Sequence, residues 1–225
     1  ERLVGNFLVA NSKFRTMFGL GGDGGLVNDN IIDDQTISGD FSWFKSPNTT
    51  VKFGTQHKTL GFEYFSKFQD SVAFRIKNAP VELGSYLKMK YSLNDLLILE
   101  PGVRINYYNV FPDSLYPDLR FGLKYLLTDD RYINLSVGNY HQFISTFQDD
   151  FNPSILDNWI AVDESVAPGK SVQFVLGYEE YIRNMYKIQV EGYYKDLKNL
   201  LTYEERRSST DAQVSDEKLS DIVTP

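Results

Sequence analysis

The chain has 225 residues, a net charge of −7, an aromatic content of 15% and no cysteine. The lack of cysteine excludes disulfides, thiolate catalysis and zinc–thiolate sites, and the negative charge argues against nucleic acid as a partner, because its phosphates would be repelled. No stretch of about 18 apolar residues occurs, so the sequence predicts no transmembrane helix.

Alternation of apolar and polar residues predicts β-strands in the first half of the chain, because successive side chains of a strand point to opposite faces. These strands cover residues 3–10, 14–20, 36–45, 50–65 and 82–91. Short stretches rich in Asn, Ser and Pro predict tight turns, at residues 11–13, 46–49 and 92–95. The longer stretches are predicted to be loops, at residues 21–35 and 66–81.

The predicted strand at residues 50–65 changes its pattern halfway along. Val51 and Phe53 suit one face of the strand, whereas Leu60 and Phe62 suit the other. One extra residue would bring the two halves back into phase, so the sequence predicts a β-bulge near Lys58.

The second half of the chain repeats the alternation. Its predicted strands cover residues 96–108, 118–127, 131–143, 169–181 and 186–198. Tight turns are predicted at residues 128–130 and 182–185, and long loops at 109–117 and 144–168. Pro101 lies inside one of these strands, which favours an edge strand or a bulge there because proline cannot donate a ladder hydrogen bond.

The clearest strand is the last one. Tyr186, Ile188 and Val190 fall on one face, whereas Lys187, Gln189 and Glu191 fall on the other. A charged face cannot lie in an ordinary apolar core. This face therefore either meets water or lines a wet cavity.

Short turns alternate with long loops along the chain, and aromatic residues gather near the strand ends. Both features are typical of an outer-membrane barrel, whose short turns are periplasmic and whose aromatic belts lie at the two membrane interfaces. Tyr and Phe are also good strand formers, which is the simpler explanation of their number. We predict an all-β fold: residues 1–198 form an antiparallel up-and-down meander of about ten strands of a transmembrane β-barrel, and residues 199–225 form a polar external loop or a disordered tail.

The sequence contains no recognisable catalytic constellation. Its two histidines, His57 and His141, are far apart, and neither has an evident second ligand or orienting partner nearby in the sequence. No Gly-x-Ser-x-Gly elbow occurs, and no Lys-Ser or Lys-Thr follows the glycines at 21–25. We therefore predict no metal, no cofactor and no enzymatic activity.

From about residue 82 onward, the order of features resembles the barrel of TonB-dependent outer-membrane receptors. The segments that carry the resemblance are Leu99–Tyr108, Asp118–Tyr125, Asn134–Phe143, the loop Trp159–Ala161, Pro168–Glu179 and Val190–Leu200. The resemblance implies a fragment of a longer receptor in the cell outer membrane, with the plug domain absent. The implied function is active uptake of a scarce nutrient, and siderophore, cobalamin, haem, glycan and peptide uptake are all compatible with it.

The resemblance also implies partners and roles for individual residues. The partners would be outer-membrane lipid, the plug and TonB system of the full-length protein, and a small-molecule or oligosaccharide ligand. Polar residues on the wet face would line the lumen, namely Arg104, Arg120, Lys124, Gln189 and Glu191. The residues predicted to contact the ligand are Tyr140, His141 and Trp159.

A soluble all-β sandwich, acting in surface adhesion or carbohydrate binding, is the main alternative, because it shares the alternation and the turns. A passive porin and an enzyme barrel are further alternatives. The apolar face distinguishes the first two hypotheses: a sandwich buries this face, whereas a membrane barrel leaves it exposed as a continuous band.

Overall fold

The computed structural model describes residues 1–21, 25–69, 71–94, 96–112, 115–147, 158–183, 185–203 and 223–224. Most of them form one antiparallel sheet of ten strands in the order β1-β2-β3-β5-β6-β7-β8-β11-β12, with β4 paired to β3. The bounds are β1 Arg2–Leu20, β2 Leu26–Ser46, β3 Thr49–Phe68, β4 Ser71–Asn78, β5 Val81–Leu93, β6 Leu97–Tyr108, β7 Leu115–Thr128, β8 Arg131–Gln142, β11 Gly169–Ile182 and β12 Tyr186–Lys198. The predicted antiparallel meander is confirmed.

Two small hairpins lie outside this sheet. They are β9 (Ile144–Phe147) with β10 (Asn158–Ala161), and β13 (Thr202–Tyr203) with β14 (Val223–Thr224). Most of the predicted loop or tail at 199–225 lies outside the described residues. No helix that could cross a membrane occurs in the described ranges.

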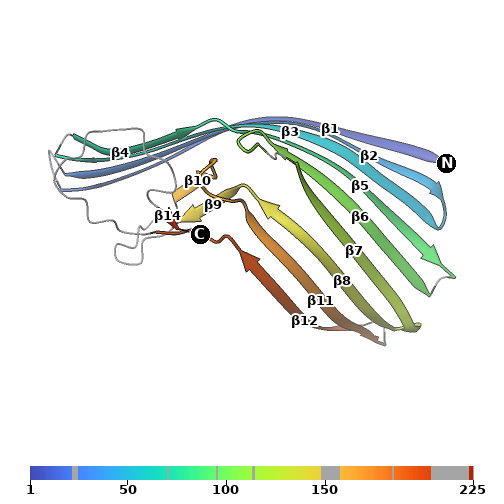
Figure 1. The fold of residues 1–225 in the computed structure, drawn as a ribbon. Coiled ribbons are helices and arrows are strands. Elements are labelled where there is room, and N and C mark those ends of the chain that lie inside the picture. The colour runs from blue at the N-terminus through green and yellow to red at the C-terminus, as the bar shows by residue number, and fades with distance from the viewer. Residues whose placement is uncertain are drawn as a thin grey trace.

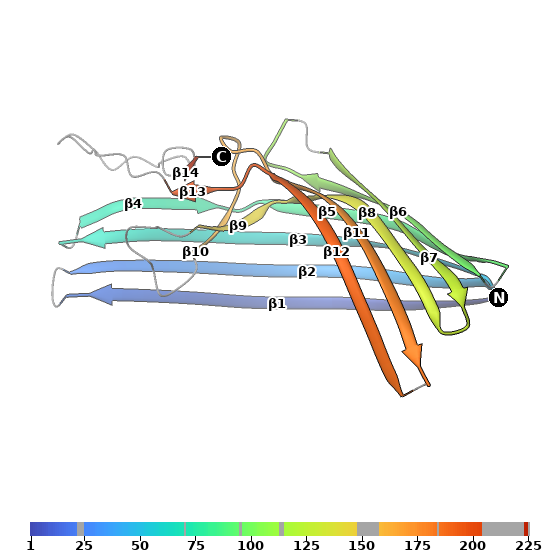
Figure 2. The ribbon, with the colours of Figure 1, turned by 90° about the horizontal axis from the view of Figure 1, so that it is seen from below.

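The sheet is curved, and the hairpin β9–β10 lies on its concave side (Figure 1). We call this concave side the inner face and the convex side the outer face. The first three strands have 19, 21 and 20 residues, whereas β5 has 13 and β6 has 12. Figure 2 shows the consequence: β1–β3 and β4 extend beyond the rest of the sheet at the end that carries the long connections, which we call the long-loop end.

The predicted turn at residues 11–13 is wrong. β1 runs through this stretch without interruption, and Asn11, Ser12 and Lys13 pair with Gln35, Asp34 and Asp33 of β2. Much of the predicted loop at 21–35 is therefore strand. Turn-forming residues are accommodated because both faces are polar here and Lys13 Nζ lies 3.5 Å from an Asp33 carboxylate oxygen.

The predicted loop at residues 66–81 also contains a strand. β4 pairs with the far part of β3, from Phe62↔Asn78 outward, and β5 pairs with the near part, from Thr59↔Val81 inward. Between them, the Leu60 amide donates to the Pro80 carbonyl at 3.0 Å. The two strands thus act as one long strand that is broken at Ala79–Pro80.

The two faces of the sheet differ in chemistry as the alternation requires. Large apolar side chains on the outer face are exposed, for example Phe7 (78%), Leu119 (62%) and Val190 (63%). Residues of opposite parity, such as Arg104 and Lys124, lie on the inner face. No second sheet covers the outer face in the described part of the chain, so this face lacks the apolar partner that a sandwich requires.

Aromatic side chains also cover glycines on the outer face. Phe7 lies opposite Gly39, and Phe41 lies opposite Gly5, with ring carbons 3.4 Å and 3.0 Å from the positions where a Cβ would be. Phe7 meets Phe41 edge-on, and Phe41 stacks on Phe53. This row stiffens three adjacent strands at positions where glycine supplies no side chain.

The bulge predicted near Lys58 is absent. The pairing of β2 with β3 runs without a shift from Val27↔Lys67 to Phe44↔Thr50. The apolar pattern changes phase because the surroundings change: Phe53 is exposed on the outer face, whereas Leu60 and Phe62 are buried on the inner face against Ala161.

Pro101 lies neither at an edge nor at a bulge. It belongs to β6, which pairs with both β5 and β7. The pairing with β5 is interrupted between Lys88↔Gly102 and Tyr91↔Leu99, and it resumes in the same register. The missing donor is therefore accommodated by a local gap in the ladder.

Candidate functional site

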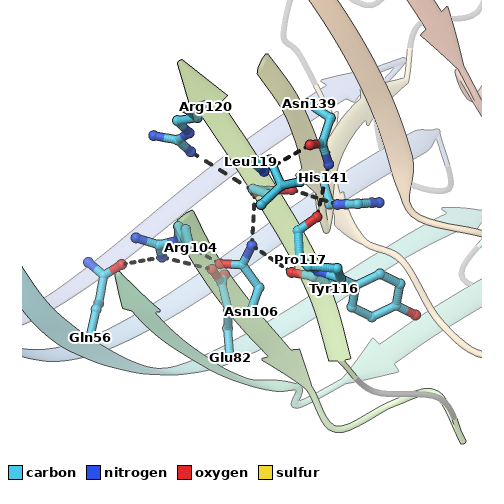
Figure 3. Close-up of polar contacts among 11 residues, drawn as sticks. Gln56, Glu82, Arg104, Asn106, Tyr116, Pro117, Leu119, Arg120, Asn139 and His141 are labelled. Carbon is cyan, nitrogen blue, oxygen red and sulfur yellow. Dashed lines mark hydrogen bonds and ion pairs between the residues drawn. The ribbon is translucent and has the colours of Figure 1, made fainter. Parts of the chain in front are cut away.

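A continuous polar network crosses the inner face from β3 to β8 (Figure 3). The Arg104 guanidinium donates to Gln56 Oε1 at 3.4 Å and to Asn106 Oδ1 at 2.6 Å. Asn106 Nδ2 donates to Asp118 Oδ2 at 3.0 Å. The other oxygen of Asp118 lies 2.7 Å from His141 Nδ1. Alternation on adjacent strands places Gln56, Arg104, Asn106 and Asp118 on one face. His141 reaches Asp118 from β8, although its neighbour Tyr140 holds the inward register position opposite Ser171.

Asp118 is the centre of this network. Only 2% of the residue is exposed, and so is only 2% of Asn106. A buried carboxylate is tolerated only with partners, and Asp118 has His141, Asn106 and, at 4.0 Å, Arg120. The His141 ring also packs against Tyr116, with centroids 5.3 Å apart. The Asp118–His141 pair therefore fixes the long-loop end of β8 relative to β7.

Two inner-face glycines let long side chains cross a strand. A Cβ at Gly84 would lie 2.2 Å from Arg104 Nη2, and a Cβ at Gly54 would lie 2.9 Å from the Tyr86 ring. Across Gly54, the Tyr86 hydroxyl donates to Asp40 Oδ1 at 2.8 Å. Any larger residue at these positions would displace the side chain above it.

A second polar cluster lies on the inner face near the short turns. Glu179 is buried and faces Lys124 at 3.6 Å and Lys187 at 3.3 Å. The Lys124 ammonium also lies 4.1 Å from the centroid of the Tyr132 ring. Farther along β12, Gln189 Nε2 donates to Glu191 Oε1 at 2.6 Å. The predicted lumen residues thus lie on the inner face, in two separate groups.

The hairpin β9–β10 is fastened to the inner face at the long-loop end. Asn30 Nδ2 donates to the Trp159 carbonyl at 3.0 Å, and Asn78 Nδ2 donates to the Ala161 carbonyl at 2.9 Å. Carbonyls of alternate residues point to the same edge of a strand, so the two asparagines hold one edge of β10. Both Asn Oδ1 atoms are buried without a hydrogen-bond partner among the described residues.

Apolar packing supports the same hairpin. Tyr108 stacks on Phe143 with centroids 4.6 Å apart, and both contact Val162. The Tyr108 hydroxyl donates to the Val162 carbonyl at 2.9 Å. Burial raises the pKa of Tyr108 above its ordinary value, and nearby carboxylates such as Glu82 raise it further, so the hydroxyl keeps its proton.

The buried apolar residues of the described chain are concentrated around this hairpin. They are Leu60, Phe62, Tyr64, Ile76, Tyr108, Phe143, Ile160, Ala161, Val162 and Val166. Each fully buried large side chain of this kind contributes about 1.5–3 kcal/mol. Apolar packing therefore holds the hairpin firmly against the inner face of the sheet.

The structure brings together only some of the residues predicted to contact a ligand. Tyr140 and His141 are adjacent on β8, and the Arg120 guanidinium lies 4.6 Å from the centroid of the Tyr140 ring. Trp159 lies apart on β10, where 40% of it is exposed. The prediction missed Asp118 and the two asparagines that hold β10. Asp118 lies two residues before Arg120, so the alternation could have assigned it to the polar face. Nothing in the sequence linked Asn30 or Asn78 to residues near 160.

The inner face offers hollows but no evident metal site. One hollow of about 420 Å³ lies over β5–β8, and another of about 390 Å³ lies over β8, β11 and β12. Within the described ranges, no cluster of three or more His, Asp or Glu residues could hold a metal ion. The arrangement suits contact with a polar molecule.

A curved antiparallel sheet with an exposed apolar outer face and a polar, internally hydrogen-bonded inner face defines a partial wall of a membrane-type β-barrel. The sequence model described as "TonB dependent receptor-like, beta-barrel" matches residues 4–217. The chain therefore belongs to the TonB-dependent receptor β-barrel family, as the resemblance indicated. No curated protein matches the sequence.

Solved structures of similar fold are receptors and importers. The structure of the FpvAI–pyocin S2 complex has a TM-score of 0.61 and 14% identity, over 90% of this chain and 31% of that one. The ferric yersiniabactin uptake receptor FyuA from Yersinia pestis has a TM-score of 0.59 and 13% identity, over 89% and 34%. The RagAB peptide transporter has a TM-score of 0.50 and 8% identity, over 91% and 29%. The chain thus spans about a third of these proteins, and the likeness shows the fold alone.

Proposed function

We propose that this chain is part of the wall of an outer-membrane receptor that imports a scarce nutrient in a TonB-dependent manner. The observation that carries the proposal is the division of the sheet into an apolar outer face and a polar inner face. A lipid bilayer and a wet lumen impose this division on a barrel strand. Membership of the TonB-dependent receptor family supports the energised uptake.

The short turns would lie on the periplasmic side and the long-loop end outside the cell. The outer face would contact outer-membrane lipid. The inner face, with Arg104, Arg120, Lys124, Gln189 and Glu191, would line the lumen and contact the plug domain of the full-length protein. The hairpin β9–β10 would narrow the external mouth on the side of β2 and β3, against which β10 packs.

The ligand would be a molecule too large or too scarce for passive diffusion. A siderophore, cobalamin, a glycan and a peptide are the candidate classes. FyuA is a ferric yersiniabactin uptake receptor and RagAB is a peptide transporter, which supports the first and the last of them. Tyr140, His141 and Trp159 remain the proposed contacts for this ligand. Their positions on β8 and β10, at the long-loop end, support this proposal.

The test uses the full-length receptor in its Gram-negative host. Cells that carry the receptor should take up their limiting nutrient, and uptake should stop when either the receptor gene or the gene for TonB is deleted. Re-expression of the receptor should restore uptake. Uptake that persists without TonB would contradict the energised mechanism, and recovery of the receptor in the soluble fraction would contradict the barrel assignment.

A further inference from the structure

A hollow on the inner face lies where β8, β11 and β12 approach the long-loop end. Its volume is about 390 Å³. The pairs Ser171↔Tyr140 and Gln173↔Lys195 bring residues of the three strands together across its floor. β10 packs on the same inner face, over β2 and β3 toward the opposite end of the strand order. The hollow therefore lies outside the contacts that β10 makes with β2 and β3.

The charge in this hollow is not balanced within the described residues. In the long-loop half of the inner face, Lys58 lies 3.2 Å from Asp34, Arg104 lies 3.7 Å from Glu82, and Arg120 lies 4.0 Å from Asp118. Lys195 also faces inward, but no carboxylate oxygen of the described chain lies within 4.0 Å of it. No Asp or Glu lines the hollow either, whereas a second lysine, Lys170 of β11, does.

Hydroxyl groups accompany the Lys195 ammonium. Gln173 Nε2 donates to Ser171 Oγ at 3.0 Å, so the serine hydroxyl accepts this bond and keeps its own hydrogen for another acceptor. Tyr140 also lines the hollow, and the Arg120 guanidinium lies against its ring. Leu197 and Leu200 add an apolar wall. An ammonium with neighbouring hydroxyl donors suits an anionic oxygen acceptor.

We propose that this hollow is a subsite for an acidic group, a carboxylate or a phosphate, of the imported ligand. Lys195 is its counter-ion, and the hydroxyls of Ser171 and Tyr140 donate to its oxygens. The inference rests on the proposed uptake function and narrows its ligand to molecules that carry an acidic group. It also gives Tyr140 a defined role, whereas Trp159 lies outside this hollow.

The test titrates the full-length receptor in detergent micelles with three small probes by calorimetry: citrate, glycerol 3-phosphate and uncharged glycerol. Citrate or glycerol 3-phosphate should bind and glycerol should not. Lys195→Met keeps the length of the side chain and removes its charge. A hydrogen bond to a charged group contributes about 1.5–3 kcal/mol, so the Lys195→Met variant should bind the anion at least about tenfold more weakly. Ser171→Ala should weaken binding by a smaller factor.

Lys52→Met is the matched control. Lys52 also faces inward without a carboxylate partner in the described residues, but it lies on β3 near the short turns and outside this hollow. This variant should bind the anion as the unmodified receptor does. Heat-modifiable mobility in gels would establish that each variant keeps a folded barrel.

Binding of neither anion would overturn the proposal. So would equal binding by the Lys195→Met variant, or equal losses in the Lys195→Met and Lys52→Met variants. The anion that binds more tightly decides between a carboxylate and a phosphate. If the receptor imports its nutrient but the Lys195→Met variant binds the anion as tightly as the unmodified receptor, only this inference fails. If TonB-dependent uptake itself is absent, the proposed function fails, whatever the titration shows.

Discussion

The near and far halves of β3 have the same backbone and opposite surroundings. Near the short turns, Phe53 points outward and is exposed, and Gln56 points inward to the polar network. Toward the long-loop end, Leu60 and Phe62 point inward and are buried beneath the hairpin, while Glu63 points outward and pairs with Arg75. Even-numbered side chains point inward along the whole of β3. What changes along the strand is the surroundings of each face.

The difference between the two halves shows that apolar side chains mark the face that is shielded from water. Along one strand this face can change from the outer to the inner side of the sheet. The far half of the long strands behaves like a soluble sheet with a small core, covered by β9–β10. The near half behaves like the wall of a barrel in lipid. Ion pairs on the outer face occur in the far half, where Lys13 meets Asp33 and Arg15 Nε donates to Asp29 at 2.9 Å. In the near part of the sheet the outer face carries one at the short-turn end, where Arg131 Nε lies 3.0 Å from a Glu180 oxygen.

The largest effect is expected from truncation of the buried core in the far half. Phe62→Ala should destabilise the docked hairpin by about 3–5 kcal/mol, because it removes a buried aromatic ring and leaves a cavity. Hydrogen exchange at the amides of β10 in the full-length receptor measures this loss. Phe53→Ala on the near half is the matched control, and it should leave exchange in β10 unchanged. Equal effects of the two variants would remove the distinction between the halves.

A charge on the outer face tests the near-half environment. Val190→Arg should destabilise the folded receptor in lipid by about 2–4 kcal/mol, because the arginine would lie near the middle of the bilayer. Gln189→Arg, one residue earlier on β12, points inward and should cost far less. Urea unfolding in lipid vesicles measures both variants. A larger cost for Gln189→Arg would mean that the two faces have been assigned the wrong way round.

A methyl group at Gly84 tests the polar network. Gly84→Ala should cost about 1–3 kcal/mol, because the new Cβ would overlap the Arg104 guanidinium and force it to move. Gly102→Ala is the control, since its Cβ would meet its nearest neighbours at 3.6 Å, an ordinary contact. The midpoint of urea unfolding should fall only for the first variant.

The smallest effect is expected from Asn78. Asn78→Ala removes one hydrogen bond to β10 and should weaken the docking of the hairpin by about 0.5–1.5 kcal/mol. The loss is limited because the variant also removes a buried amide oxygen that has no partner in the described residues. Limited proteolysis of the hairpin provides the measurement. Protection equal to that of the unmodified receptor would show that apolar packing alone holds β10.

The sequence by itself determined the antiparallel meander, because period-two alternation states which residues share a face. In β12 it placed Ile188 and Val190 opposite Lys187, Gln189 and Glu191, and the register confirms this division. It also placed Arg104, Arg120 and Lys124 on one face. It failed at residues 11–13 and 71–78, where turn-like composition hides strands whose pairing with a neighbour outweighs local preference.

Only the tertiary structure decided what covers each face. The contacts of Asn30 with Trp159, and of Leu60 and Phe62 with Ala161, join residues about a hundred or more positions apart. No local pattern predicts such contacts, because alternation shows which face a side chain is on and not which segment packs against that face. For the same reason, the phase change in β3 resembled a bulge in the sequence. In the fold it marks the place where the inner face passes from a polar network to a buried core.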